Sequence, residues 1–381
     1  MKCSHFIIYA VMLLVSLAAC RKDDIIIYME EEIISVRPTQ SEAVGMYILC
    51  EGNMGSNKCT LDYLDLSDSL QVTYQRNIYA ERNPNEVKEL GDVGNDAKIY
   101  GSQLWLVINC SNKVEVCRAK DARKLAKIDI PNCRYLAFHK GFAYVSSYVG
   151  PVAVSGDAPL GQVYKIDTLT HQIVGRINVG YQPDELAVLG DRLYVANSGG
   201  YRVPDYDRTV SVINLQTFQE ERKIDVVPNL HRIRTDQYGQ LWVTSRGNNI
   251  NEPARLSWLI PDNNGQMQPA GSLNLQISDL CIVGDSLYYI SRDTKSYGII
   301  NVRTHSVISD KLSSAPELAK VKMPYGIIVN PNGRDFYVMD AKNYVSSGEL
   351  LHFLADGTFD YKVRTGDIPA HATFVMKSKK N

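Results

Sequence analysis

A repeated unit runs from residue 45 to the C-terminus and constrains the fold more than any other feature of the sequence. Each copy contains a glycine turn followed by a short apolar strand with an aromatic residue near its start. The aromatic residues are Tyr47, Trp105, Tyr144, Tyr194, Trp242, Tyr288 and Tyr337. Their spacing of roughly 40 to 60 residues is that of a four-stranded propeller blade and is too long for ankyrin or leucine-rich repeats.

The rest of each unit also consists of short strands. Residues 114–128, 163–177 and 210–224 align without gaps and alternate apolar and polar residues, as strand, turn and strand do. A further apolar strand precedes each aromatic strand after the first, at residues 97–99, 136–138, 186–188, 233–235, 280–282 and 327–329. Four strands in each of seven units predict an all-β fold, a seven-bladed β-propeller.

The first unit has no inner strand of its own, because only a charged segment precedes Tyr47. A spare copy of that strand, residues 369–375, lies at the other end of the chain. We therefore expect the C-terminal strand to pair into blade one, which leaves no open sheet edge where the ring closes. An open β-solenoid is the alternative architecture, but it does not explain a strand missing at one end and present at the other.

The N-terminus is typical of a bacterial lipoprotein. Lys2 precedes an apolar run at residues 6–16, and Leu17-Ala18-Ala19-Cys20 matches the cleavage and acylation site of such proteins. We predict a signal peptide at 1–19, a lipidated Cys20 with a flexible leash over 20–43, and the propeller over 44–381. No second apolar stretch reaches membrane-spanning length, so we expect membrane contact through the lipid anchor only.

The residues after Cys20 bear on the destination of the protein. Arg21-Lys22-Asp23-Asp24 resembles the lipoprotein export signal of the Bacteroidota, in which a basic residue is followed by two acids. This resemblance implies the outer membrane, with the protein facing the cell exterior. The alternative is a charged start to a flexible tether, which has no addressing role.

Composition and motifs argue against several functions. The net charge is −1 and no basic stripe is present, so we do not expect nucleic-acid binding. The sequence has no nucleotide-binding glycine fingerprint, no Walker loop, no zinc-protease helix and no nucleophile elbow. The seven histidines lack metal-ligand spacing. We therefore expect no enzyme activity, no catalytic residue, no metal site and no resident cofactor.

Some polar residues directly precede or begin the inner strands. His231 and His371 would be acid–base or metal-binding groups if an orienting partner lay beside them, and otherwise polar residues at the rim of the central opening. The acids in similar positions would either cap the blades through hydrogen bonds or bind calcium. These acids are Asp96, Asp184, Glu185 and Asp279.

Six cysteines follow Cys20, in a compartment that would permit disulfides. They are Cys50, Cys59, Cys110, Cys117, Cys133 and Cys281. Cys50 and Cys59 flank one hairpin loop and would be able to pair across it. Cys117 and Cys281 replace Ile or Ala of other repeats, so we interpret them as small core residues. No Cys-x-x-Cys pair indicates zinc or thioredoxin chemistry.

The loops between second and third strands share one face of a propeller with the loops that precede the inner strands. Here they are rich in Asn, Tyr, Arg and Gly, and tyrosines outnumber phenylalanines by 23 to 8. Turns are generally polar, but Tyr and Arg in nearly every loop favour a face that stacks on and hydrogen-bonds to a ligand. We expect residues 79–93 to overhang this face. The candidate ligand-binding residues are Asn53, Asn109, Arg134, Tyr148, Tyr201, Tyr206, His231, Arg246, Arg292, Tyr297, Tyr325, Tyr344 and His371.

Three stretches, residues 48–63, 326–338 and 367–374, resemble the YncE-like, DUF5074 propellers of Bacteroidota lipoproteins. The similarity spans nearly the whole mature chain. Within that family it is greatest to the surface lipoproteins that capture cobalamin (vitamin B12) and sit over a BtuB-like, TonB-dependent outer-membrane transporter. Cys50 and Cys59 depart from the polar or small residues expected at their positions.

The resemblance implies a tethered receptor that captures cobalamin or related corrinoids and passes them to such a transporter. A corrinoid has a broad apolar ring face, a fringe of neutral amides and one phosphodiester. Tyrosines would lie against the ring, asparagines would pair with amides, and Arg134, Arg246 or Arg292 would meet the phosphate. Two alternatives remain: a propeller hydrolase or lyase using His231 and His371, and a protein-binding cap of another TonB-dependent nutrient transporter.

Overall fold

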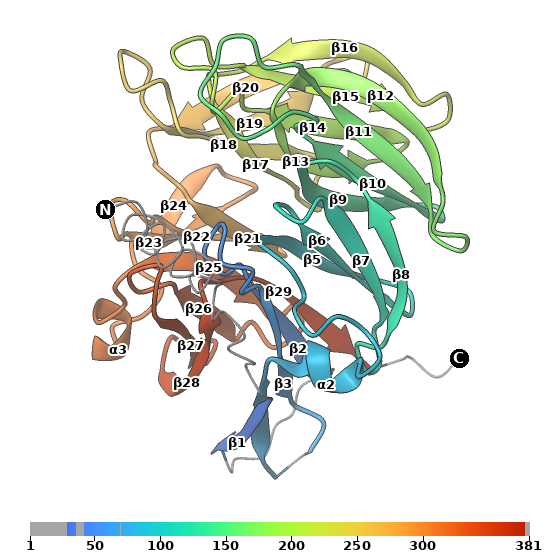
Figure 1. Cartoon of the computed structure of the whole chain (residues 1–381). Coiled ribbons are helices and arrows are strands. Elements are labelled where there is room, and N and C mark those ends of the chain that lie inside the picture. The colour runs from blue at the N-terminus through green and yellow to red at the C-terminus, as the bar shows by residue number, and fades with distance from the viewer. Residues whose placement is uncertain (1–28, 36–41, 69, 378–381) are drawn as a thin grey trace, which may run out of the picture.

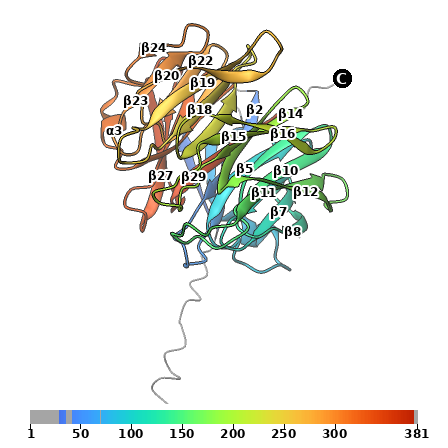
Figure 2. The same ribbon diagram turned by 90° about the horizontal axis from the view of Figure 1, so that it is seen from above.

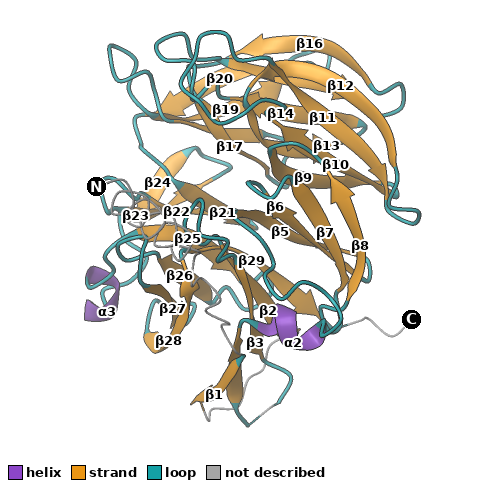
Figure 3. Cartoon of the chain, in the orientation of Figure 1, coloured by secondary structure: helices purple, strands orange, loops and turns teal. Residues whose placement is uncertain are grey.

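Seven antiparallel sheets surround a central axis (Figure 1). The computed structural model describes residues 29–35, 42–68 and 70–377. In these ranges almost every regular element is a strand, and the helices are the short α2 (Ile78–Arg82) and α3 (Pro316–Ala319) (Figure 3). The predicted all-β, seven-bladed propeller is therefore confirmed. None of the described helices has the length and apolar character needed to cross a membrane.

The strands of each blade are given below in order from the central axis outward. Blade one contains β29 (Pro369–Met376), β2 (Ala43–Cys50), β3 (Thr60–Asp65), β4 (Val72–Arg76) and β1 (Glu30–Ser35). Blade two contains β5 (Gly94–Tyr100), β6 (Gln103–Ile108), β7 (Lys113–Arg118) and β8 (Lys124–Asp129). Blade three contains β9 (Cys133–His139), β10 (Phe142–Ser147), β11 (Leu160–Asp167) and β12 (Ile173–Tyr181). Blade four contains β13 (Pro183–Leu189), β14 (Arg192–Asn197), β15 (Thr209–Asn214) and β16 (Gln219–Asp225).

The remaining blades repeat the same order. Blade five contains β17 (Leu230–Thr235), β18 (Leu241–Ser245), β19 (Arg255–Pro261) and β20 (Met267–Leu273). Blade six contains β21 (Asp279–Val283), β22 (Ser286–Ile290), β23 (Tyr297–Asn301) and β24 (Ser306–Ser309). Blade seven contains β25 (Pro324–Val329), β26 (Phe336–Asp340), β27 (Ser347–Phe353) and β28 (Phe359–Asp367). Strands β27 and β12 lie on opposite sides of the ring in both Figure 1 and Figure 2.

The two ends of the propeller chain meet in blade one. Strand β29 pairs antiparallel with β2, so that Tyr47 lies opposite Thr373 and Leu49 lies opposite His371. Figure 1 shows the red β29 beside the blue β2. The predicted ring closure by the C-terminal strand is confirmed, and the pairing leaves no open inner edge at the join.

The core lies between neighbouring blades and is built on the repeated aromatic residues. All of those predicted from the spacing sit on second strands and are buried. Tyr47 of β2, for example, packs with Leu104 and Ile108 of β6. The turns before these strands need a left-handed residue, and Gly141 (φ 84°) and Gly190 (φ 59°) adopt that conformation without the steric cost of a Cβ.

Blade one has a fifth strand that the repeat did not predict. Residues 30–35, which we expected to belong to the flexible leash, form β1 and pair with β4. Arg76 holds this strand through ion pairs with Glu30 and Glu32, and Ile34 packs against the blade-one core. The predicted signal peptide and Cys20 lie outside the described residues.

Residues 79–93 do not overhang the loop face, contrary to expectation. Ile78 and Tyr79 of α2 are buried in the core between blades one and two. The Asn83 amide donates to the Ala122 carbonyl at 3.0 Å, in the turn at the opposite end of blade two. Residues 79–93 therefore run along the interface between blades one and two to the opposite end of the propeller and then return. They follow this path because their apolar side chains fill the groove between the two blades.

The described cysteines are all free thiols, so the disulfide considered between Cys50 and Cys59 is absent. Both side chains are buried, and burial raises the pKa of each thiol. Cys117 is fully buried, as expected of a core residue, whereas Cys281 is partly exposed.

Candidate functional site

The inner strands begin, and the second strands end, at the same end of the propeller axis. We call this end the funnel face. Neighbouring strands of a blade run in opposite directions, so the outermost strand of one blade ends at the same end of the axis at which the inner strand of the next blade begins. The polar residues at these strand ends therefore converge from all seven blades, although they are far apart in sequence.

A cavity of about 230 Å³ lies on the axis at the funnel face, and we call it the axial cavity. Its charged and aromatic lining comes from Glu51, Arg134, Tyr135, His231, Arg232, Arg246, Arg292, Asp293, Tyr325 and His371. The cavity is smaller than the roughly 300–1,000 Å³ of most small-molecule pockets. A large ligand would therefore insert one part here and lie over the surrounding loops.

A buried carboxylate fixes one side of the axial cavity. Asp184 is completely inaccessible to solvent, and its Oδ1 accepts a 2.7 Å hydrogen bond from the Tyr148 hydroxyl and a longer one from Arg134. Its Oδ2 lies 3.0 Å from His231 Nδ1 and accepts from Arg246 at 3.3 Å. Burial alone would raise the pKa of Asp184, but these donors hold it well below the usual range. The carboxylate is thus ionised and orients four side chains.

His231 is a neutral imidazole at this site. Burial is the largest influence on it, and together with the Arg246 charge it holds the pKa of His231 well below its usual range. The hydrogen bond to Asp184 acts in the opposite direction and is outweighed. At neutral pH His231 therefore presents one N–H and one lone pair.

Tyr135 lines the cavity between its two histidines. Its ring lies between two histidines, with its centroid 6.2 Å from that of His231 and 6.3 Å from that of His371, both in edge-on geometry. On the His371 side, Glu51 accepts from His371 Nε2 at 3.2 Å and from the Tyr325 hydroxyl at 3.1 Å. Two histidine–carboxylate pairs therefore flank one tyrosine.

The four arginines of the cavity keep most of their donors available. Arg134 and Arg246 share Asp184, and Arg292 donates Nε to Asp293 at 3.2 Å. Arg232 is buried, and its Nε has no aligned hydrogen bond although Asp279 Oδ1 lies 3.1 Å away. A guanidinium has several N–H groups, so each of these residues retains donors for a ligand. This lining suits a ligand rich in carbonyl or phosphate oxygens.

A second hollow of about 320 Å³ opens among the loops of blades one to three. We call it the loop hollow. Met54, Val149, Pro151 and Val152 supply an apolar lining, and Asn109 and Cys110 lie at its edge. The funnel face thus combines a donor-rich axial cavity with an apolar hollow to one side.

The structure brings six of the predicted site residues together in the axial cavity. They are Arg134, His231, Arg246, Arg292, Tyr325 and His371. Tyr148 lies directly behind them, with its ring 4.7 Å from the Arg134 guanidinium carbon. Tyr344 contacts Tyr325 edge-on at the rim, and Tyr201 contacts Tyr148 in the same way.

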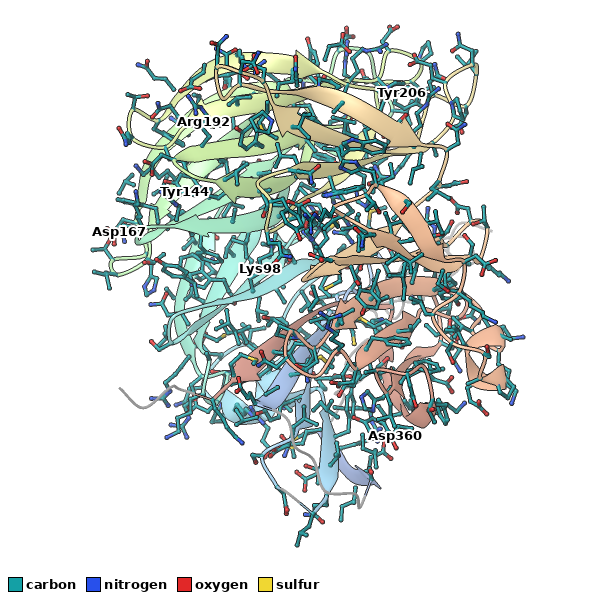
Figure 4. All side chains as sticks on the ribbon, turned by 180° about the vertical axis from the view of Figure 1, so that it is seen from behind. Lys98, Tyr144, Asp167, Arg192, Tyr206 and Asp360 are labelled. Atoms are coloured by element: carbon teal, nitrogen blue, oxygen red, sulfur yellow. The ribbon has the colours of Figure 1, made fainter. Side chains whose placement is uncertain are left out.

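The other predicted residues lie elsewhere. Asn109 is buried and donates to Asn132 and the Cys133 carbonyl, so it holds two blades together. Tyr297 packs against the core of blades six and seven. Asn53 accepts from Ser56 within its own turn. Tyr206 lies on the long loop of blade four, which Figure 4 labels far from the axis.

Sequence reasoning did not single out Glu51, Tyr135, Arg232 or Asp293. Tyr135 and Arg232 lie within strands that appeared apolar, and the other two lie next to candidate loops. The sequence did contain a pattern that identifies such residues. When the seven inner strands are aligned by their pairing with the second strands, the position occupied by Asp96 in blade two is polar in six blades. The residues at this position are Asp96, Tyr135, Glu185, Arg232, Asp279, Gly326 and His371. Six polar side chains at one position of a strand that should be buried indicate a lined channel.

The acids of the inner strands act as caps between blades. Asp96 accepts from the Leu136 amide, Glu185 from the Ile233 amide and Asp279 from the Ile327 amide, each at about 3 Å. In the described ranges no group of three or more His, Cys, Asp or Glu side chains is placed to hold a metal ion. The calcium alternative therefore finds no support in these residues.

Comparisons with known proteins support the fold alone. No family model matches the chain, and no curated protein is similar to it. Among solved structures, a functionally unknown protein from Desulfotomaculum acetoxidans matches 87% of this chain and 98% of its own, with 10% identity and a TM-score of 0.61. A quinonprotein alcohol dehydrogenase-like protein from Bacteroides thetaiotaomicron matches 88% and 79%, with 12% identity and a TM-score of 0.59.

A third structure, of Kuenenia stuttgartiensis hydrazine synthase, covers 84% of this chain and 96% of its own, with 15% identity and a TM-score of 0.58. The chain, a seven-bladed β-propeller, is thus similar in fold to these bacterial proteins. At these identities the shared fold carries no information about the ligand.

Proposed function

We propose that this protein is a lipid-anchored surface receptor that captures cobalamin or a related corrinoid on its funnel face and passes it to a TonB-dependent outer-membrane transporter. One observation carries the proposal: a donor-rich, arginine-lined cavity and an apolar hollow both open on the funnel face. A corrinoid needs both, since its ring is apolar and its amides and phosphodiester are acceptor-rich.

The sequence resemblance supplies the corrinoid as the specific ligand. The chain resembles, within the YncE-like propellers, the cobalamin-binding lipoprotein BtuG, whose partner is the transporter BtuB. The cavity lining is compatible with this assignment, because Arg134, Arg246 and Arg292 line the same cavity and offer donors to phosphate and amide oxygens. Asp184 holds the less exposed Arg134 in place before any ligand arrives, which lowers the entropic cost of binding.

The direct test is titration of the chain from residue 21 onward, which retains every described strand, with cyanocobalamin. We expect stoichiometric binding by calorimetry and a change in the visible corrin absorbance. Arg246→Ala should weaken binding about 10- to 100-fold, since a hydrogen bond to a charged group contributes about 1.5–3 kcal/mol.

A matched control is Arg192→Ala. Arg192 is also a partly exposed, ion-paired arginine, but it pairs with Glu221 at the other end of blade four, and Figure 4 shows it away from the loop that carries Tyr206. This variant should bind as the unmodified chain does. Absence of binding at micromolar cyanocobalamin would contradict the corrinoid proposal and leave the fold unaffected.

A hydrolase or lyase is the second candidate, favoured by the histidine–carboxylate pairs on either side of Tyr135. Such pairs are typical of general acid–base catalysis. This candidate predicts turnover of an ester or glycoside that is lost when both His231 and His371 are replaced. A purely protein-binding cap predicts neither turnover nor corrinoid binding.

A further inference from the structure

The two ring nitrogens of His231 have different surroundings. Nδ1 lies 3.0 Å from Asp184 Oδ2 and 2.8 Å from Arg246 Nη2, and it can serve only one of them. If Nδ1 were unprotonated, its lone pair would face a buried, ionised carboxylate that cannot move away. Arg246 is 41% exposed and can swing aside at little cost. The proton therefore belongs on Nδ1, donated to Asp184.

This tautomer leaves the lone pair on Nε2. His231 lines the axial cavity, and no protein atom in the described ranges forms a hydrogen bond to its Nε2. The neighbouring His371 differs, because its Nε2 is already paired with Glu51. His231 thus offers the cavity a neutral imidazole with an unused, fixed lone pair.

An imidazole whose other nitrogen donates to a carboxylate is the usual arrangement of a metal-ligating histidine. The described residues around His231 do not supply the further ligands that a free metal ion would need. One histidine is sufficient only for a metal that already carries its own equatorial ligands and has an open axial position. The cobalt of a corrinoid is such a metal.

We propose that His231 Nε2 is an axial ligand to the cobalt of the bound corrinoid. This inference rests on the proposed corrinoid capture and names the atom that holds the metal. In the step, Nε2 donates its lone pair to cobalt and one axial ligand leaves: a water molecule in base-free cobinamide, or the nitrogen of the corrinoid's own nucleotide base in cobalamin, which is then released from cobalt. The cobalt oxidation state does not change and no proton is transferred. Asp184 acts as a positioning residue, because it fixes the ring and strengthens Nε2 as a donor.

The test uses cob(II)inamide, a corrinoid without a nucleotide base, so that any axial nitrogen must come from the protein. The electron paramagnetic resonance spectrum of the complex should show each cobalt line split into a triplet by one ¹⁴N nucleus. Protein labelled with [¹⁵N]histidine should convert that triplet to a doublet. This labelling leaves every side chain in place, so it does not depend on a variant that folds.

His231→Ala should abolish the nitrogen splitting and weaken cobinamide binding at least about tenfold. His139→Ala is the matched comparison, because His139 is also paired with an aspartate, Asp191, but lies at the end of β9 away from the funnel face; it should retain both the splitting and the affinity.

The possible failures are distinguishable. If neither cyanocobalamin nor cobinamide binds, the proposed function is wrong and this inference falls with it. If cob(II)inamide binds tightly without nitrogen splitting, or if the splitting survives His231→Ala, the corrinoid function stands and axial ligation by His231 is wrong.

Discussion

Asp184 sets the positions of the cavity side chains although it has no contact with solvent. It accepts hydrogen bonds from Tyr148 and Arg134 and lies against His231 and Arg246. Removing one partner of such a group leaves a buried charge uncompensated, which costs about 3–5 kcal/mol. The ligand-binding geometry of the funnel face and the stability of blade four therefore depend on the same carboxylate.

The low pKa of His231 predicts acid sensitivity of the fold. Below the ordinary histidine pKa of about 6.5, the unfolded chain binds a proton that folded His231 refuses, so stability falls as pH decreases. The slope is about 1 kcal/mol per pH unit below that pKa. Urea unfolding at pH 7.5 and at pH 5.5 should show this loss, and His231→Gln should reduce it.

His352 provides a contrast of opposite sign. Burial would lower its pKa, but hydrogen bonds to Asp335 and Asp360 outweigh burial and raise it. Protonated His352 therefore stabilises the folded protein below about pH 6.5, and this stabilisation is lost as the pH rises through the pKa of His352 in the folded state. His352→Gln should therefore make the acid loss steeper. Equal pH dependence in both variants would contradict these assignments.

At the scale of elements, strand β29 closes the ring and also carries a site residue. It supplies the inner strand of blade one, and His371 reaches the axial cavity from it. Without β29 the buried face of β2 and an inner sheet edge would both be exposed. The closure thus ties the integrity of the funnel face to the last strand of the chain.

Truncation tests this closure. Removing residues 368–381 deletes β29, and we expect loss of the cooperative thermal transition together with aggregation. Removing only residues 378–381 should leave the melting temperature unchanged, because every described strand remains. A cooperatively folded chain that ends at residue 367 would contradict the role assigned to β29.

The number of blades and their closure were predictable because each blade repeats one pattern of turn, aromatic strand and hairpin. Strand β1 and helix α2 were not, since they have no counterpart in the other blades. Arg76 fixes β1 from the paired strand β4, more than 40 positions later in the sequence. Tyr79 fills a groove that exists only after blades one and two pack. The cavity residues were partly predictable. His231 and His371 stood out as polar, whereas Tyr135 fitted an apolar strand until its register neighbours were aligned.

At the scale of the whole molecule, the direction of β1 determines where an N-terminal tether leaves the ring. Glu30 pairs with Arg76, the last residue of β4, which ends on the funnel side. Cys20 and Glu30 are ten positions apart in the sequence, a reach of at most about 35 Å. If Cys20 anchors the protein, as we propose, we expect the funnel face to lie toward the membrane and toward the proposed transporter.

Epitope insertion on intact cells tests this orientation. A tag in the exposed turn at Leu169, at the end of blade three opposite the funnel face, should be stained by antibody. A tag beside Val154, in an exposed loop on the funnel side, should be stained less. Both tags should be stained equally in purified protein without the lipid. Preferential staining at Val154 on cells would contradict the orientation.

The central claim is that the funnel face holds a corrinoid, and cobalt provides a direct marker of its position. Crystals grown with cyanocobalamin, measured at the cobalt absorption edge, should contain one anomalous scattering peak over the axial cavity, close to His231 and Tyr135. A cobalt peak at the opposite end of the axis or on the outer edge of a blade would contradict the account, as would crystals that take up no cobalt.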